Sequence, residues 1–179
     1  IFMKSLIEND FETATKVCEQ IPDIITRKQK GTTILHILAK NRQTDAAKYV
    51  VNKIRPDKNP LNSIDKKGRT PLFVAAYFSA PSIVKMLINE GCDMNIQDKK
   101  GNTPLHAAIT MSNTRIAAFL VKSNCSVNIR NNEGKTALDM ADEMNENIAK
   151  IIRKRDNIGV SNDKILEKLI SAIEENETN

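Results

Sequence analysis

The chain has 179 residues, of which 40% are hydrophobic, so it is long enough and apolar enough to form one domain with a core. Lysine and arginine number 27 against 22 aspartate and glutamate residues, which gives a formal net charge of +5. This composition excludes a chain that is disordered throughout. No stretch approaches 18 consecutive apolar residues, and the first residues soon include charges, so the sequence predicts neither a transmembrane helix nor a signal peptide.

Cysteine usage predicts free thiols in a reducing compartment. Cys18, Cys92 and Cys125 are odd in number and form no CxxC motif, and no nearby pair of histidines completes a zinc site. We therefore expect an intracellular protein, located in the cytoplasm, the nucleus or both. Because the chain opens on Ile1 rather than Met, we also expect it to be a piece of a longer protein.

The first predicted elements are two helices within residues 1–27. Asp10 is a candidate N-cap for the second of them. Apolar residues recur behind it at helical spacing, at Phe11, Ala14, Val17 and Cys18. One face of this segment is therefore expected to pack inward.

Four related segments follow at nearly constant spacing. They are KGTTILHILA from Lys30, KGRTPLFVAA from Lys67, KGNTPLHAAI from Lys100 and EGKTALDMAD from Glu133. Their glycines are separated by intervals of 37, 33 and 33 residues. This repeat, with its Gly-x-Thr-Pro-Leu-His pattern, resembles the ankyrin-repeat family over residues 28–154. The resemblance implies an all-α solenoid of stacked helix-turn-helix units with finger loops that are similar to β-hairpins.

The repeated residues suit a turn followed by two helices. The glycines are placed where the finger turn needs a positive φ, which glycine takes without steric cost. Thr70 and Thr103 can cap a first helix of about seven residues, and Pro71 and Pro104 need no N–H at its first position. The second helices of repeats two and three carry apolar stripes at Ile83, Val84, Leu87 and Ile88 and at Ile116, Ala117, Leu120 and Val121.

The resemblance divides the chain into six segments. They are an N-terminal capping helix pair (1–27), repeat one (28–64), repeat two (65–97), repeat three (98–130), a divergent repeat four (131–155) and a C-terminal capping helix (156–179). Repeat one carries an insertion at 55–60, RPDKNP, which is either a tolerated surface loop or a recognition loop. The last helix, expected at 162–176, either covers the apolar face of repeat four or binds a partner.

The sequence predicts no catalytic, metal-binding or cofactor-binding residue, and we expect no enzyme. His36 and His106 fill the same position of their repeats, where the family's histidine is structural and hydrogen-bonds between neighbouring fingers. Asp139 takes this place in repeat four. Cys92 and Cys125 are 33 residues apart, in a column that ankyrin repeats usually give to a small buried alanine, so we expect them in the core. No phosphate loop, metalloprotease motif or nucleophile elbow occurs.

The resemblance also implies a partner-binding surface, the concave side made of finger tips and the exposed face of each first helix. In the finger columns of the four repeats, eight residues are basic and one is acidic. The predicted contact residues are Lys66, Lys67, Arg69, Tyr77, Phe78, Lys99, Lys100, Asn102, Thr110, Met111, Lys135 and Met144. The adjacent aromatics Tyr77 and Phe78 are typical of an interface hot spot. The alternative is a solvated lysine face with Phe78 tucked against the neighbouring helix.

These features favour a protein-interaction module in intracellular signalling, acting as an adaptor, a scaffold or a stoichiometric inhibitor. Its expected partner is a protein segment that combines acidic residues with apolar anchors. We expect no small-molecule substrate and no membrane insertion. The alternatives are an IκB-like inhibitor of a transcription factor, a pathogen effector, and a targeting or regulatory domain of a larger enzyme or channel. Nucleic-acid binding is a weaker alternative, because aromatic residues accompany the lysines in only one repeat.

Overall fold

A computed structural model of the chain describes residues 1–21, 24–25, 27–28, 31–53 and 60–158. Within these residues the regular structure is helical and contains no β-strand, so the all-α prediction is confirmed. The chain forms two compact units, residues 1–93 and residues 94–179. Three predicted features lie outside the described residues, namely the finger residues Gln29 and Lys30, residues 55–59 of the insertion, and the helix expected at 162–176.

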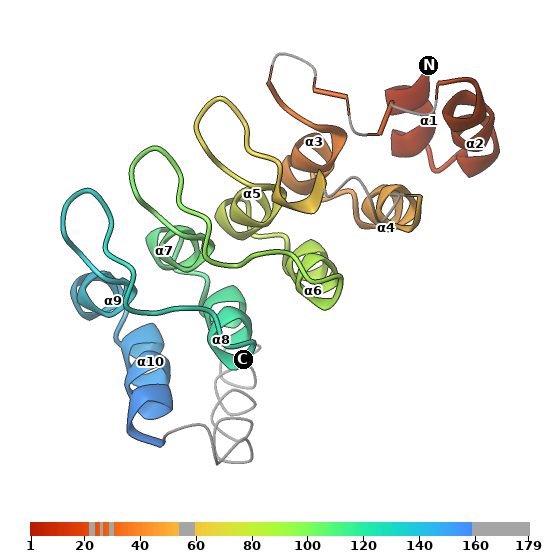
Figure 1. Ribbon diagram of the computed structural model, residues 1–179. Helices are drawn as coiled ribbons and strands as arrows, with labels where there is room; N and C mark the ends of the chain where they lie inside the picture. The colour runs from red at the N-terminus through yellow and green to blue at the C-terminus, as the bar shows by residue number, and fades with distance from the viewer. Residues whose placement is uncertain (22–23, 26, 29–30, 54–59, 159–179) are drawn as a thin grey trace. The chain divides into compact units, whose positions relative to one another are not determined.

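The first unit contains the N-terminal helix pair and the helix pairs of repeats one and two. Its helices are α1 (Phe2–Ile7), α2 (Phe11–Gln20), α3 (Ile34–Lys40), α4 (Thr44–Asn52), the 3-10 helix η1 (Pro60–Asn62), α5 (Pro71–Tyr77) and α6 (Pro81–Asn89). The two helices of each pair pack on each other, and in addition α3 packs on α5 and α4 on α6. In Figure 1, α3 and α5 thus form one row of this unit, and α4 and α6 form a second.

The second unit repeats this arrangement. Its helices are α7 (Pro104–Thr110), α8 (Thr114–Lys122), α9 (Ala137–Met144) and α10 (Glu146–Ile158). The first helices of its two repeats, α7 and α9, pack on each other, and so do the second helices, α8 and α10. Each repeat of a unit therefore buries its apolar face against a neighbouring repeat, as expected for a solenoid.

The first helix of a repeat begins where the sequence predicts. Pro71 and Pro104 occupy its first turn, where no N–H is required. The hydroxyl of Thr70 accepts the backbone N–H of Phe73 at 3.1 Å, and the repeat-three threonine caps α7 in the same way. The glycine before each of these threonines has a positive φ, with 78° at Gly68, which confirms the predicted turn.

The first helix also ends in a fixed turn. Ser79 and Ser112 follow α5 and α7 with φ of 54° and 51°, in the left-handed region that glycine usually takes. The N–H of Ala80 then bonds to the carbonyl oxygen of Ala75 at 2.9 Å and satisfies an otherwise unpaired group of the last helical turn. This turn fixes the backbone of the residue just before it, which in repeat two is Phe78.

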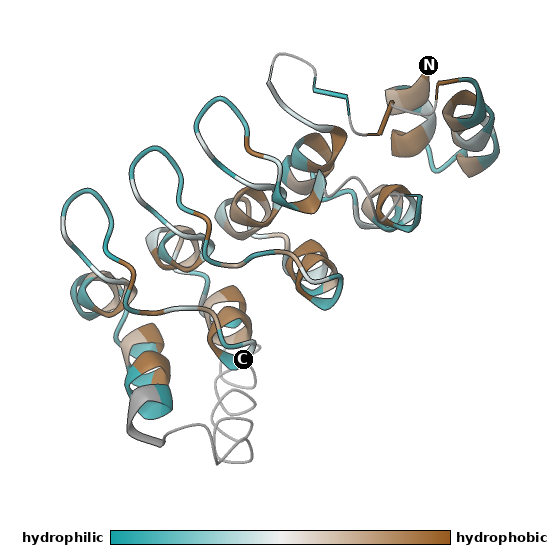
Figure 2. Ribbon diagram, viewed as in Figure 1, coloured by the Kyte–Doolittle hydropathy of each residue, from teal (hydrophilic) through white to brown (hydrophobic). Residues whose placement is uncertain are grey.

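The second helices contribute to the core together with the first helices, and their predicted stripes are buried. All members of the two stripes are buried except Ile88, which is half-buried. Figure 2 shows hydrophobic residues concentrated on the helices and hydrophilic residues along the finger loops. Burying one leucine or isoleucine of such a stripe contributes on the order of 2 kcal/mol, so the facing helices stabilise each unit and leave the fingers free for other uses.

The N-terminal segment agrees with its prediction, whereas the insertion and the last helix differ from theirs in detail. Oδ1 of Asp10 accepts the N–H of Thr13 at 3.1 Å, so its predicted role as an N-cap is confirmed. Pro60, the last residue of the insertion predicted as a loop, is buried in η1, which packs on α5. α10 continues to Ile158, so the expected boundary between 155 and 156 falls inside a helix.

Among the described residues, no helix is long and apolar enough to cross a membrane.

Candidate partner-binding surface

A single side chain at the base of each finger shapes the turn in repeats two to four. Asp65, Asp98 and Asn131 occupy this position at 33-residue intervals. Oδ1 of Asp65 accepts the backbone N–H groups of Lys67 and Arg69 at 2.8 and 3.0 Å. Asp98 makes the same two bonds at 2.9 and 2.9 Å, and Asn131 makes them at 3.0 and 3.0 Å. These Asx turns hold the exposed finger backbone in one conformation.

The finger of repeat one differs at this position. It holds Lys28, whose ammonium group has no acceptor to offer the finger backbone. Its Nζ instead donates to the carbonyl oxygen of Ile64 at 3.2 Å, at the start of the next finger. Repeat one therefore lacks the side-chain acceptor that closes the later fingers.

Histidines connect successive fingers within each unit. The N–H of Thr33 points at Nδ1 of His36 at 3.3 Å, so the ring carries its proton on Nε2 and donates it to the carbonyl oxygen of Arg69 at 2.8 Å. His106 bonds in the same way to its capping threonine at 3.2 Å and to the carbonyl oxygen of Lys135 at 3.3 Å. Burial lowers the pKa of both imidazoles, and the hydrogen bonds to the carbonyl oxygens raise it. The effect of burial is larger, so both pKa values lie below the ordinary value of histidine. The geometry expected of structural histidines is confirmed at both positions.

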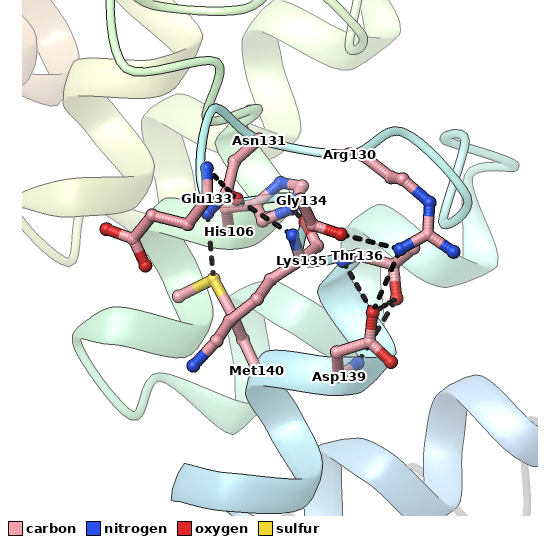
Figure 3. A network of polar contacts seen from close by, with 9 residues as sticks. All are labelled: His106, Arg130, Asn131, Glu133, Gly134, Lys135, Thr136, Asp139 and Met140. Atoms are coloured by element: carbon pink, nitrogen blue, oxygen red, sulfur yellow. Dashed lines mark hydrogen bonds and ion pairs between the residues drawn. The ribbon is translucent and has the colours of Figure 1, made fainter.

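The fourth repeat replaces the histidine by a carboxylate, as Figure 3 shows. Oδ2 of Asp139 accepts the N–H and the hydroxyl of Thr136, both at 2.8 Å, and so still caps α9. The backbone hydrogen bond from Thr136 is the main cause that lowers the pKa of Asp139. Arg130 approaches the same oxygen at 3.7 Å. Asp139 therefore retains the capping role of the histidine, but its carboxylate has no N–H group that could donate to the backbone of another finger.

Two of the predicted basic contact residues are engaged in ion pairs. Nε and Nη2 of Arg69 bind Oδ2 of the buried Asp65 at 2.9 and 2.7 Å. Burial opposes ionisation of Asp65, but the hydrogen bonds from Arg69 and the finger backbone outweigh it, so the pKa of this carboxyl lies below its usual value. Nζ of Lys135 binds Glu143 at 2.6 Å, and this bond raises the pKa of Lys135. Both side chains thus support the fold of their own repeat.

The remaining predicted residues of repeat two lie on the finger and at the end of α5. Lys66 and Lys67 are exposed at the finger tip. Tyr77 is exposed, and its ring meets that of Phe78 edge to face, with the centroids 5.2 Å apart. Phe78 is half-buried, and Nζ of Lys40 lies 5.9 Å from the centre of its ring. The exposed aromatic surface is therefore mainly that of Tyr77, whereas Phe78 is partly covered by repeat one.

A pocket of about 650 Å³ lies between the fingers and first helices of repeats one and two. Its lining residues are Thr32, His36, Ile37, Lys40, Asn41, Asp65, Lys67, Arg69, Val74 and Phe78. It brings together three of the predicted contact residues, Lys67, Arg69 and Phe78. Lys40 and Asn41, at the end of α3, join them. The pocket thus combines an apolar part with cationic side chains on the surface where the fold positions the fingers.

The predicted contact residues of the second unit lie at equivalent places of repeats three and four. Lys99 and Lys100 are exposed at the finger tip, and Thr110, Met111 and Met144 are exposed near the ends of α7 and α9. Asn102 is half-buried, because its Oδ1 accepts the side-chain N–H of Asn131 at 3.0 Å. Exposed lysines and methionines thus occur together here, while the role of these residues in binding stays a prediction.

The three cysteines lie in different environments in the part of the chain that the structure describes. Cys92 and Cys125 are buried, as predicted, and burial raises their thiol pKa values to about 12 and about 11. Cys18 is half-buried, and all three thiols are free. In the parts of the chain that the structure describes, no three histidine, cysteine or carboxylate side chains are grouped to hold a metal ion.

The repeated fingers, the paired helices and the inter-finger histidines agree with a comparison of the sequence against protein families. A family model for ankyrin repeats in three copies matches residues 2–98 and 75–165. The chain therefore belongs to the ankyrin-repeat family. Ankyrin repeats are generally protein–protein interaction modules and are typically non-catalytic. Comparison with curated protein sequences gives no match.

Sequence reasoning missed two sets of residues that shape this surface. The finger acceptors Asp65, Asp98 and Asn131 could have been found, because they recur at the same 33-residue interval as the glycines. Lys40 and Asn41 lie at the end of the first helix of repeat one, and nothing in the sequence placed them in one pocket with Phe78. That proximity depends on how repeats one and two pack.

Proposed function

We propose that this chain is a protein-interaction module that acts as an adaptor, a scaffold or a stoichiometric inhibitor by covering part of a partner protein. The observation that carries the proposal is the combination of exposed lysines with exposed Tyr77, beside a pocket, on one finger and helix surface of the first unit. Such a surface suits a partner segment that contains acidic and apolar residues. The three free thiols support an intracellular location.

A protein partner agrees better with the charges than a nucleic acid does. Arg69 and Lys135 are paired with Asp65 and Glu143, which reduces the positive charge available to a phosphate backbone. The apolar part of the surface adds nothing to contacts with phosphates, whereas it can anchor a protein side chain.

The first experiment is affinity capture with three baits that carry matched changes. The baits are wild type and two variants. The first-unit variant carries Lys66→Glu, Lys67→Glu and Phe78→Ala. The second-unit variant carries the equivalent changes Lys99→Glu, Lys100→Glu and Met111→Ala. A protein that wild type captures, and that one variant or both variants lose, supports the proposal. Circular dichroism checks that both variants keep their helix content.

The affinity for a captured protein is then measured at increasing salt concentration. We expect it to fall, because exposed ion pairs are screened once their separation approaches the Debye length, about 10 Å at 0.1 M salt. If both variants still capture the protein, and if salt does not change its affinity, neither finger surface binds the partner.

A further inference from the structure

The pocket between repeats one and two has an apolar part and a polar part. Its apolar lining residues are Ile37 on α3 and Phe78 just after α5, both half-buried, with the buried Val74 of α5 behind them. Lys40 and Lys67 are exposed and lie at its edges, one on helix α3 and one on the finger of repeat two. Its volume of about 650 Å³ lies within the range of pockets that bind ligands.

The net charge of the pocket comes from its two lysines. Arg69 and Asp65 neutralise each other through the 2.7 Å ion pair. His36 is neutral, because Nδ1 accepts a hydrogen bond and Nε2 donates one. The other lining residues carry no charge, and within the described residues no carboxylate lies within ion-pair distance of Lys40 or Lys67. The pocket therefore presents two cations that no carboxylate of the described chain neutralises.

We propose that this pocket binds an acidic peptide segment of a partner protein, with an apolar side chain against the half-buried Ile37 and Phe78 and a neighbouring carboxylate between Lys40 and Lys67. Charge complementarity selects the carboxylate, and burial of the apolar side chain supplies affinity. Lys40 already lies near the negative face of the Phe78 ring, which holds one cation beside the apolar wall. The inference rests on the proposed function and names the chemistry of the partner.

A nucleic acid fits the same pocket less well. Binding of single strands uses exposed aromatic rings on which bases stack, and of the two rings among the lining residues, His36 is buried and only Phe78 is partly exposed. Its ring is half-buried and already in contact with Tyr77. The observations therefore favour a peptide.

The test selects short random peptides, displayed on phage, against the complete chain. We expect the enriched peptides to place Asp or Glu next to a bulky apolar residue. The variant Lys40→Glu with Lys67→Glu should bind them about tenfold or more weakly. A matched variant, Lys48→Glu with Lys85→Glu, makes the same change in net charge on exposed positions of α4 and α6 and should keep the wild-type affinity.

Two further measurements separate specific recognition from a general effect of charge or a loss of folding. A peptide whose acidic residues are changed to lysine should bind the Lys40→Glu, Lys67→Glu variant better than it binds wild type. Phe78→Ala should weaken binding about tenfold, whereas Phe119→Ala, which removes a half-buried ring from α8 in the second unit, should change it little. Thermal unfolding shows whether each variant remains folded.

Several outcomes would overturn the inference. The pocket variant is Lys40→Glu with Lys67→Glu, and the control variant is Lys48→Glu with Lys85→Glu. If both lose the same affinity for the peptides, only the net charge matters. Peptides or captured partners that are lost with Lys99→Glu and Lys100→Glu, but kept by the pocket variant, would place binding on the second unit and leave the proposed function intact. Binding of a labelled DNA duplex through Lys40 and Lys67, without any selected peptide, would replace the peptide by a nucleic acid. A failure to obtain either peptides or captured proteins would overturn both proposals.

Discussion

The turn glycines of repeats three and four share a left-handed backbone but differ in their surroundings. Gly101 has φ of 76° and Gly134 has φ of 75°. A Cβ added to Gly101 would lie 2.7 Å from the backbone nitrogen of Asn132 and 2.9 Å from Cα of Asn131. A Cβ added to Gly134 would meet nothing within 4 Å. Repeat three therefore needs glycine both for its φ and for the close approach of the next finger.

This difference predicts unequal effects of the same substitution. Gly134→Ala should lower the free energy of unfolding by about 1 kcal/mol, the cost of a left-handed alanine. Gly101→Ala should lower it by roughly 3 kcal/mol or more, because the backbone of the next finger must also move. Urea unfolding followed by circular dichroism measures both. Equal losses in the two variants would contradict the close packing of fingers three and four.

At the scale of the element, each finger of repeats two to four is a short loop whose tip is exposed but whose shape is fixed. The acceptor at its base supplies two hydrogen bonds to the backbone, and an inter-finger bond adds another, such as that from the N–H of Asn132 to the carbonyl oxygen of Lys100 at 3.0 Å. Ordering the finger before a partner arrives reduces the entropy lost on binding. A rigid finger therefore suits a binding surface.

The finger of repeat three allows a matched test of the acceptor. Asp98→Ala removes the oxygen that accepts the N–H groups of Lys100 and Asn102, and should lower the free energy of unfolding by about 1 kcal/mol. Asp98→Asn keeps an acceptor oxygen, as Asn131 does in repeat four, and should cost much less. Hydrogen exchange of the two N–H groups reports the same loss locally. A large and equal effect of both substitutions would show that the charge, rather than the acceptor, is required.

At the scale of the whole molecule, the same hydrogen bond occurs in both units, from a histidine of one repeat to a backbone carbonyl of the next. Each contains a buried histidine that joins its fingers in the neutral form, with His36 in the first unit and His106 in the second. Protonation would place a second proton on Nδ1, which must accept a hydrogen bond from the capping threonine. Both units are therefore expected to lose stability together in acid.

The stability of the whole chain should consequently decrease as the pH falls below about 6.5, the ordinary pKa of histidine. Because burial lowers the folded-state pKa of both histidines, the unfolded chain binds protons more readily, and stability is complete only above that pH. The variant His36→Gln with His106→Gln should cost about 1–2 kcal/mol at neutral pH, through lost hydrogen bonds. Between about pH 6.5 and pH 5 its stability should depend less on pH than that of wild type. An equal pH dependence of both proteins would assign the effect to other groups.

The sequence by itself determined the fold, because the information that selects it is local. A turn glycine, a capping threonine, a first-turn proline and a stripe of helical period each act within a few residues, and their recurrence at 33 residues identifies the stack. The structural histidines and the buried Cys92 and Cys125 followed from the same repeat positions, and the N-cap Asp10 followed from its place before a helical apolar pattern. The surface that carries the exposed lysines could also be anticipated from these columns.

Only the tertiary structure decided which of those residues remain available to a partner. Arg69 and Lys135 match the basic pattern of the other residues, yet their charges are paired with Asp65 and Glu143. Lys40 and Phe78 are 38 positions apart along the chain, and the packing of α3 on α5 brings them to the same pocket. The physical reason is that pairing and pocket formation depend on distances between side chains of different repeats, and residue spacing within one repeat does not encode those distances.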